Sequence, residues 1–256
     1  MSLKSIYQVE KGKWNELAKK KEKRIIENEL LKPGEDFYAF NRISATHVGV
    51  NEFLGDLSDK HVLEYGCGLG QMSSLLAKDC PKVTTFDISK DSIHVTKKRA
   101  QLNEVDDKIE PVVSAGENLP FATESFDIIF GKAILHHLNV SYGGEELYRV
   151  LKPGGKAVFV EPMGMNPVLN FARDHLPYFS KNPRGADSPL IYDEIYAWGR
   201  CFRKFRFQEV QLLGMLERIL GRKLKLKFAR KLDAFLLRHM PFLRKYCRYV
   251  VLYMEK

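Results

Sequence analysis

Three glycines alternate with other residues directly after a short apolar segment. Gly66, Gly68 and Gly70 follow residues 61–65, which have the composition of a buried strand, and residues 71–78 have a helical pattern. A strand, a glycine turn and a helix in this order place backbone amides at the carboxyl edge of a parallel sheet, where nucleotide-like ligands bind. The loop therefore predicts a ligand site.

The spacing of the glycines and the acids around them indicate the kind of ligand. Dinucleotide sites carry G-x-G-x-x-G, whereas Gln71 stands at the third glycine position here, and no G-K-[ST] of a P-loop follows. Asp87 ends the second apolar segment, where a carboxylate can accept both hydroxyls of a ribose. Glu64 lies two residues before Gly66 and suits a cationic ligand better than a pyrophosphate. A ligand that combines adenosine with an ammonium and a sulfonium fits both acids.

Apolar strands alternate with helical segments through the middle of the chain. Strands are expected at 61–65, 83–86, 109–113, 126–130 and 157–160, and helices at 71–78, 89–103 and 145–151. Continuous apolar strands of this kind predict a parallel sheet covered on both faces, the doubly wound α/β class. Helical stretches are expected before this region at 9–31 and 36–57. After it we expect a helix at 193–203 and strands at 206–213 and 249–254.

Five segments, taken in this order, resemble the motifs of class I S-adenosylmethionine-dependent methyltransferases of the type 11 kind. They are V-L-E-Y-G-C-G-L-G-Q at 62–71, Asp87, E-N-L-P-F at 117–121, residues 126–138, and L-K-P-G-G at 151–155. The likeness covers about residues 45–161. It implies a Rossmann-like, seven-stranded sheet with an antiparallel last strand, S-adenosylmethionine as cofactor and S-adenosylhomocysteine as product.

The resemblance also implies a set of residues that contact the cofactor. These are Glu64, Gly66, Cys67, Gly68, Gly70, Gln71, Asp87, Ile88, Gly116, Glu117, Lys132 and Ala133. Asp87 would bind the ribose, and Glu64 would hold the ammonium through the loop or a water. The chain departs from the pattern at Ala115, where many relatives use Asp to accept a hydrogen bond from the adenine amino group. Either Glu117 replaces that acid, or the backbone alone holds the adenine.

A pair of histidines follows the fourth expected strand, facing the place where an acceptor would meet the methyl group. His136 aligns with a histidine that takes part in catalysis in some phosphobase methyltransferases, within a similar A-I-L-H segment. Because a histidine titrates near neutral pH, His136 can take the proton of a hydroxyl acceptor and is the candidate base. The alternative is that one histidine packs and the other bonds to backbone.

Six further residues are candidates for the acceptor pocket: Tyr38, His137, Glu161, Asn166, Arg173 and His175. Glu161 ends the fifth expected strand, where relatives line that pocket. For Asn166, Arg173 and His175 the alternative is a structural role in the loop. The four cysteines form no C-x-x-C, so we expect neither a structural zinc site nor an active-site metal.

The chain is expected to divide into a helical N-terminal lid at 1–57 and a methyltransferase domain at 58–256. Within the domain, residues 162–200 would cap the acceptor pocket, and 214–247 would form a basic helical insertion. The net charge of +9 is concentrated there, because residues 215–248 hold eleven basic and two acidic side chains. Such a helix can lie on an anionic membrane or substrate, or it can dock on the core with its charges in water.

The sequence therefore predicts an enzyme that methylates a small-molecule acceptor, with oxygen as the favoured acceptor atom, in metabolite, glycan or lipid-linked biosynthesis. One alternative is an RNA-directed methyltransferase, although residues 131–134 lack the [DNS]-P-P-[YFW] motif of enzymes that methylate base amino groups. Another is a non-catalytic cofactor-binding protein at a membrane surface. With no apolar run long enough for a membrane span and no signal-peptide pattern, we expect a cytoplasmic protein, with peripheral contact at the inner membrane face as a further expectation.

Overall fold

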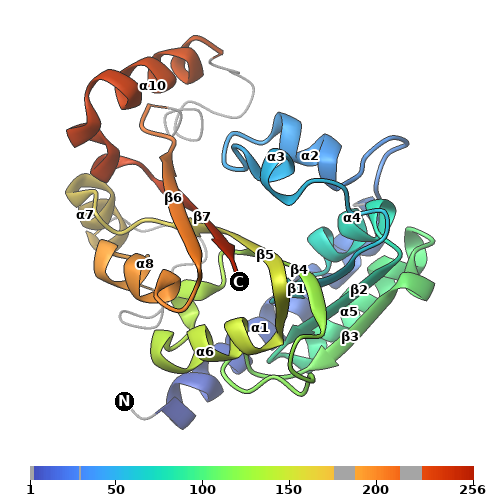
Figure 1. Ribbon diagram of the computed structural model, residues 1–256. Coiled ribbons are helices and arrows are strands. Elements are labelled where there is room, and N and C mark those ends of the chain that lie inside the picture. Colours follow the sequence, from blue (N-terminus) through green and yellow to red (C-terminus); the bar gives the residue numbers. More distant parts are fainter. Residues whose placement is uncertain (1–2, 29, 176–187, 214–226) are drawn as a thin grey trace.

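The computed structural model describes residues 3–28, 30–175, 188–213 and 227–256, and over these residues the strands form one seven-stranded sheet (Figure 1). The strands are β1 (His61–Tyr65), β2 (Lys82–Asp87), β3 (Ile109–Val113), β4 (Phe126–Lys132), β5 (Leu151–Pro162), β6 (Lys204–Val210) and β7 (Tyr249–Glu255). Their order in the sheet is β3-β2-β1-β4-β5-β7-β6. Strands β1 to β5 are parallel, and β7 pairs in antiparallel with β5 and β6. The expected doubly wound, Rossmann-like α/β sheet with an antiparallel last strand is confirmed.

Helices cover both faces of this sheet (Figure 1). They are α1 (Leu3–Asn28), α2 (Phe37–Ile43), α3 (Val50–Leu54), α4 (Gln71–Asp79), α5 (Lys90–Leu102), α6 (Val140–Val150), α7 (Pro167–His175), α8 (Tyr192–Gly199) and α10 (Lys227–His239). Three short 3-10 turns complete the described elements: η1 (Asp106–Lys108), η2 (Leu135–His137) and η3 (Pro241–Tyr246). Buried residues of α2, α3 and α4 pack on one face of the sheet, and those of α6 and α8 pack on the other.

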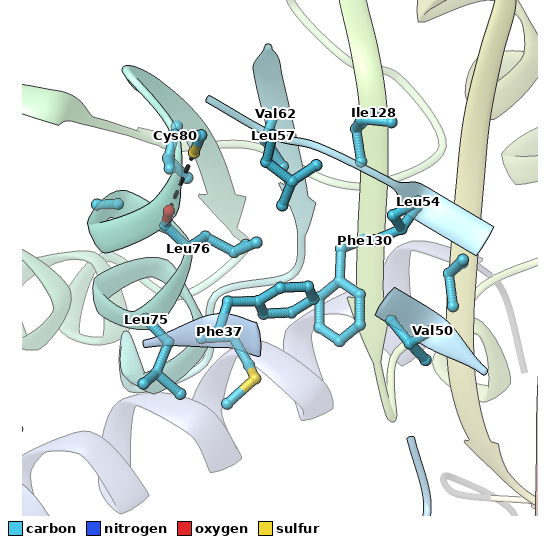
Figure 2. Packing of buried hydrophobic residues seen from close by; sticks show 14 of the residues in the cluster. Phe37, Val50, Leu54, Leu57, Val62, Leu75, Leu76, Cys80, Ile128 and Phe130 are labelled. Carbon is cyan, nitrogen blue, oxygen red and sulfur yellow. Dashed lines mark hydrogen bonds between the residues drawn. The ribbon is translucent and has the colours of Figure 1, made fainter. Parts of the chain in front are cut away.

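The core on the first face shows why α2 and α3 belong to the domain and not to a separate layer. The ring of Phe37 meets the ring of Phe130 edge to face, with centroids 4.9 Å apart, and Leu75 and Val50 lie beside them (Figure 2). All four side chains are fully buried or nearly so. Burial of an aromatic side chain contributes roughly 1.5–3 kcal/mol, so this contact binds residues 37–54 firmly to the sheet.

The segment at 36–57 forms two short helices where the sequence predicted one helical stretch. Gly49 and Gly55 adopt left-handed φ angles of 70° and 75°, which a continuous helix does not allow. Asp36 caps the first helix by accepting a hydrogen bond from the amide of Ala39 at 2.6 Å. The result is a compact turn that brings α3 back onto the sheet.

Helix α6 begins at Val140, five residues earlier than the sequence predicted. Asn139 caps it by accepting a hydrogen bond from the amide of Ser141 at 3.0 Å. The first turns of this helix were not predicted because they contain Gly143 and Gly144, and glycine disfavours a helix interior. Packing requires glycine at one of these positions: a Cβ on Gly143 would lie 2.6 Å from the ring of Trp198, which is buried in α8.

The bounds of several other elements also differ from the expectation. Helix α1 begins at Leu3, not at residue 9, and strand β5 extends over Leu151–Pro162, beyond the predicted 157–160. Helix α8 ends at Gly199, before the expected 203, and strand β6 covers Lys204–Val210 where 206–213 was expected. The pairing of β4 with β5 shifts register between Phe126 and Ile128, opposite Pro153 and the two glycines after it, which indicates a bulge in β5.

Parts of the expected cap and insertion lie outside the described residues: 176–187 of the cap at 162–200, and 214–226 of the insertion at 214–247. The described remainder of the cap contains α7 and α8, and that of the insertion contains α10 and η3. Figure 1 shows α10 at the edge of the molecule, beyond β6 and above α7. In the described part of the chain, no helix combines the length and the apolar character that a membrane crossing requires.

Candidate cofactor and acceptor site

The glycine loop after β1 has a backbone path that requires glycine. Gly66, Gly68 and Gly70 have φ angles of 82°, 50° and 75°, all in the left-handed region. A Cβ on Gly66 would lie 2.8 Å from the side chain of Ile134, and one on Gly70 would lie 2.8 Å from the Cα of Thr96. The loop is thus packed between the segment after β4 and helix α5.

Asp87 ties this loop to the end of β2. One carboxylate oxygen accepts a hydrogen bond from the amide of Gly68 at 3.0 Å, and the other accepts one from the amide of Ser89 at 2.9 Å. The side chain lies at the cavity wall and the residue is only 8% exposed. Its burial raises the pKa of the carboxyl group to about 6. The backbone bonds fix its orientation, and lone pairs remain for ligand hydroxyls.

Glu64 is a buried acid near the end of β1. Its carboxylate accepts hydrogen bonds from the hydroxyl of Ser73 and, at 3.1 Å, from the hydroxyl of Thr85. Burial raises the pKa of Glu64 to about 7, and a cation nearby would favour its charged form. A ligand ammonium would supply that cation.

These residues open onto one cavity of about 540 Å³ at the carboxyl ends of β1, β2 and β4. That volume is in the range of small-molecule sites. The lining includes Glu64, Gly66, Cys67, Gly68, Gln71, Asp87, Ile88, Gly116, Glu117, Lys132 and Ala133. Of the positions implied by the resemblance, Gly70 does not line the cavity. It precedes α4 and packs on Thr96, so its role is to shape the loop.

Two histidine–carboxylate pairs stand side by side after β4. His136 Nδ1 lies 2.7 Å from Glu161 Oε2, and His137 Nδ1 lies 3.4 Å from Glu10 Oε2. The two imidazole rings have centroids 4.1 Å apart. His137 and Glu10 line the cavity, whereas His136 and Glu161 lie behind that wall. Of the two, His137 is therefore the histidine that faces a ligand.

The comparison with protein families identifies the region that holds this site. Residues 63–159 match the family model described as a methyltransferase domain. The strand order of the sheet agrees with that match. The chain contains a class I S-adenosylmethionine-dependent methyltransferase domain.

Two curated relatives of this region are methyltransferases by name. Demethylmenaquinone methyltransferase of Chlorobaculum parvum is 32% identical over 155 residues, which cover 59% of this chain and 60% of that protein. Phthiotriol/phenolphthiotriol dimycocerosates methyltransferase 1 of Mycobacterium ulcerans is 30% identical over 145 residues, covering 56% and 49%. The matched region thus spans less than two thirds of these relatives.

Solved structures share the fold of the methyltransferase domain. Geranyl diphosphate C-methyltransferase from Streptomyces coelicolor, solved with S-adenosylhomocysteine, superposes with a TM-score of 0.59 at 14% identity over 85% of this chain and 78% of that one. YcgJ of Bacillus subtilis gives a TM-score of 0.54 at 19% identity, covering 80% and 95%. At these identities the likeness establishes the fold.

The methyltransferase cavity fits S-adenosylmethionine, the cofactor of this class. Asp87 offers an oriented carboxylate for ribose hydroxyls, and Glu64 offers a buried one for an ammonium. Ala115 lines the cavity without a side-chain acceptor, whereas Glu117 holds one oxygen toward the amide of Asn139 at 3.2 Å. The hydroxyl of Tyr7 bonds to Glu117, which helps to raise the pKa of that tyrosine. Glu117 therefore brings a carboxylate to the part of the cavity where Ala115 offers none.

The sequence predicted a helical lid at 1–57 but none of the residues by which helix α1 reaches this site. Tyr7, Glu10, Trp14, Lys21 and Ile25 line the cavity and, at helical spacing, share one face of α1. Only the packing of α1 against the rest of the domain shows which side faces inward.

Tyr38, the expected aromatic of the lid, has a different place in the methyltransferase domain. Its hydroxyl donates a hydrogen bond to the carbonyl of Gly55 at 2.6 Å and accepts one from the amide of Leu57 at 2.9 Å. These bonds fix the segment that leads into β1. Tyr38 is not part of the described cavity lining.

Three other expected acceptor residues lie at the ends of α7: Asn166 directly precedes it, and Arg173 and His175 lie in its last turn. Asn166 caps α7 by accepting bonds from the amides of Val168 and Leu169, and it donates one to the carbonyl of Tyr246 at 2.7 Å. The other two residues contact neighbours within α7: Arg173 donates a hydrogen bond to Asn170, and His175 stacks on Phe171 with ring centroids 4.3 Å apart. Their contacts are those of helix architecture, and none of the three belongs to the described cavity lining.

Proposed function

We propose that the chain transfers a methyl group from S-adenosylmethionine to a small, hydroxyl-bearing acceptor. The observation that carries this proposal is that the glycine loop, Asp87 and His137 open onto one cavity. When bound, the cofactor supplies a methyl group on a sulfonium for direct displacement. Asp87 and Glu64 hold the ribose and the ammonium, and enclosure by the cavity walls fixes the orientation on which displacement depends.

His137 is the proposed proton acceptor for the hydroxyl group. It lines the cavity, whereas His136, the candidate from the sequence, donates its Nδ1 hydrogen to Glu161 in the layer behind. Glu161 and His136 thereby support the ring of His137 from the side away from the ligand. We assign His136 and Glu161 a positioning role and His137 the proton transfer.

A hydroxylated aromatic ring fits this arrangement and the activities for which the relatives are named. Demethylmenaquinone methyltransferase and a ubiquinone/menaquinone C-methyltransferase from Geotalea daltonii, 33% identical over 106 residues, are among them. Loss of the hydroxyl proton activates both the ring oxygen and the ring carbon beside it. We therefore propose a quinol-like acceptor, with methylation of the oxygen, as the sequence favoured, or of the adjacent carbon.

The test begins with calorimetric titration of the purified protein with S-adenosylhomocysteine. Micromolar binding at one site per chain supports the proposal, and absence of binding contradicts it. Labelled S-adenosylmethionine is then offered with a reduced short-chain naphthoquinone, with total tRNA as the comparison acceptor. Label in the naphthoquinol supports the acceptor class, and nuclear magnetic resonance of the product separates oxygen from carbon methylation. Label in tRNA alone would support an RNA substrate instead.

We further propose that this cytoplasmic enzyme contacts the inner face of a membrane through α10. On the exposed face of that helix, Lys231 and Arg238 flank Phe235, which is 58% exposed, and Phe242 of η3 is 62% exposed. Cations around an exposed aromatic side chain are typical of helices that lie on anionic lipid.

Co-sedimentation with vesicles that contain anionic lipid tests this contact. The double variant Lys231→Glu/Arg238→Glu should lose binding at low salt, whereas the control Lys97→Glu, an exposed lysine of α5, should keep it. Absence of wild-type binding at low salt would contradict the membrane proposal and leave the methyltransferase proposal intact.

A further inference from the structure

Lys132 is the last residue of β4 and lies at the border between the cavity and helix α2. Side chains alternate along a strand, so Lys132 shares its face of the sheet with Ile128 and Phe130, which belong to the core under α2 and α3. The ammonium group lies 5.1 Å from the centre of the ring of Phe40 in α2. Lys132 is exposed and lines the cavity, so its positive charge is accessible to a ligand.

No carboxylate neutralises this charge within the part of the chain that the structure describes. Lys132 forms no ion pair there. The nearby acids have other partners: Glu64 accepts bonds from two hydroxyls, Asp87 from two amides, and Glu161 from two amides and an imidazole. The surrounding protein removes part of the hydration of Lys132, which lowers its pKa. A partly dehydrated cation of this kind is stabilised when an anion binds beside it.

The histidine next to Lys132 is uncharged. His47 is 2% exposed, and its ring contacts those of Phe40 and Phe130, with centroids 5.1 and 5.8 Å apart. Burial and the nearby charge of Lys132 lower the pKa of His47 to about 3. At neutral pH Lys132 is therefore the cation of this pair.

A chain of hydrogen bonds fixes the proton of His47 on Nδ1. Asn51 Nδ2 donates to the carbonyl of Tyr38 at 3.0 Å, and Asn41 Nδ2 donates to Asn51 Oδ1 at 2.6 Å. Because a carbonyl only accepts, both amides have a fixed orientation, and His47 Nδ1 donates to Asn41 Oδ1 at 2.6 Å. The buried Nε2 of His47 thus carries a lone pair. An imidazole in this state does not repel the ammonium of Lys132.

The turn after β4 brings Lys132 and His137 to one cavity. Ala133 adopts a left-handed φ of 55°, and its amide donates a hydrogen bond to the carbonyl of Val160 at 2.9 Å. The chain therefore leaves the direction of the strand directly after Lys132. His137 ends the 3-10 turn that follows, and both residues line the cavity. A cation and the proposed proton acceptor thus serve the same ligand site.

We propose that Lys132 holds the acceptor through a negatively charged oxygen, so that the enzyme selects an acidic, aromatic hydroxyl group. The inference rests on the proposed function. When the O–H bond breaks, the proton goes to the imidazole of His137, and the electron pair stays on the oxygen beside the ammonium of Lys132. The oxygen, or the ring carbon beside it, then forms the bond to the methyl group, while the C–S electron pair remains on sulfur. Aliphatic alcohols ionise too weakly to use this cation.

A naphthol whose absorption changes on ionisation tests this inference without turnover. The probe is 4-nitro-1-naphthol, titrated with pH in the presence of saturating S-adenosylhomocysteine. Its methyl ether, 1-methoxy-4-nitronaphthalene, is the comparison ligand that cannot ionise. In the wild-type protein the ionised naphthol should bind at least about tenfold more tightly than the neutral form, so the pKa of the bound hydroxyl falls below that of the free compound.

Variants at position 132 assign this preference to the lysine. Lys132→Met should abolish the preference for the ionised form and change the affinity for the ether by less than about twofold, because it removes the charge and keeps an unbranched side chain. Lys132→Gln, which keeps a polar side chain at this exposed position, should behave in the same way. Lys132→Arg keeps the charge and should retain most of the preference.

Lys21→Met is the matched control, because Lys21 is also exposed and lines the same cavity, from helix α1. It should leave the preference unchanged. An unchanged preference in Lys132→Met and Lys132→Gln would overturn the inference, and so would loss of the preference in Lys21→Met alone. Loss of S-adenosylhomocysteine binding in both variants at position 132 would overturn it as well, because the side chain would then serve the cofactor.

The same titrations separate this inference from the proposed function. If the wild-type protein bound no S-adenosylhomocysteine, or bound it but neither naphthalene ligand, the failure would lie with the proposed function. If it bound the naphthol and the ether without preference for the ionised form, the role of Lys132 would be wrong and the proposed function would stand.

Discussion

Glu161 at the end of β5 holds His136 through a 2.7 Å contact between Oε2 and Nδ1. The other carboxylate oxygen accepts hydrogen bonds from the amides of Ile134 and Leu135, at 2.8 and 3.0 Å. One fully buried acid thus fixes the whole turn after β4 from the neighbouring strand. His137 comes next in the chain, so its position at the cavity depends on this acid.

Replacing Glu161 by alanine should destabilise the domain by about 3 kcal/mol, because two buried amides and an imidazole lose their acceptor. Glu161→Gln keeps an oxygen for the amides and should cost about 1 kcal/mol. Urea denaturation measures both, with Glu110→Gln, an exposed acid of β3, as the control. A loss below about 0.5 kcal/mol in Glu161→Ala would show that the turn after β4 does not depend on this acid.

Asp87→Ala should weaken binding of S-adenosylhomocysteine at least tenfold, about 1.4 kcal/mol, because the ribose loses its acceptor and the glycine loop loses its tie to β2. Calorimetry gives the affinities. Asp127→Ala is a matched control: this acid also accepts a bond from a backbone amide, that of His61 at 3.0 Å, but lies at the opposite end of β4. Equal affinities of wild-type protein and Asp87→Ala would place the ribose elsewhere.

The contribution of Glu64 to the free energy of unfolding should fall as pH rises through the acidic range. Burial raises the pKa of Glu64 from 4.5 to about 7, so between these values the folded state binds its proton more tightly than the unfolded chain. This contribution therefore decreases from about pH 4.5 to about pH 7 and is flat above, by an amount of the order of 3 kcal/mol. Asp87, with a pKa raised from 3.8 to about 6, acts in the same direction over a lower range. The buried imidazole of His47, whose pKa is lowered from 6.5 to about 3, acts in the opposite direction, so the comparison with Glu64→Gln isolates the effect of Glu64.

Urea denaturation at several pH values checks this dependence. Glu64→Gln should lack the part of the slope between about pH 5 and pH 7. In the wild-type protein, affinity for S-adenosylhomocysteine should increase over the same range, because the ammonium of the ligand favours the charged carboxylate. An identical pH slope in Glu64→Gln would assign the titration to another group.

Two glycines with nearly the same backbone conformation allow the cost of packing to be separated from that of strain. Gly70 and Gly154 have φ angles of 75° and 72°, but only at Gly70 would a Cβ meet a neighbour, the Cα of Thr96 at 2.8 Å. Gly154→Ala should cost about 1 kcal/mol for the left-handed backbone. Gly70→Ala should cost about 3 kcal/mol, since the backbone of α5 must also move. Equal denaturation midpoints would mean that the loop does not pack on α5.

The sheet could be predicted because its strands are continuous apolar segments whose burial decides their structure. Strands β1 and β3 have the bounds that the sequence indicated. Helix α6 was shortened in the prediction, since Gly143 disfavours a helix locally and is required only by Trp198, more than fifty residues later in the chain. Contacts of that separation leave no local signal.

The residues of the site also divide into those with a local sequence signal and those placed by contacts between distant segments. The glycine loop, Glu64 and Asp87 are marked by local spacing, because a strand and its following turn place them directly. Glu10 and Trp14 carry no such mark: they reach the cavity only because α1 lies along α5. The choice between His136 and His137 likewise depends on Glu161 and Glu10, which approach from distant segments.

The position of β7 between β5 and β6 has a consequence for biosynthesis of the protein. Strand β6 bonds to the sheet only through β7, which follows it by about forty residues of chain. While the ribosome is still producing residues 211–248, β5 has an open edge and β6 has no partner in the sheet. The cofactor half can fold during translation, but the sheet is completed only after Tyr249–Glu255 has been released. Until then the exposed edge of β5 is the point at which nascent chains are prone to associate wrongly.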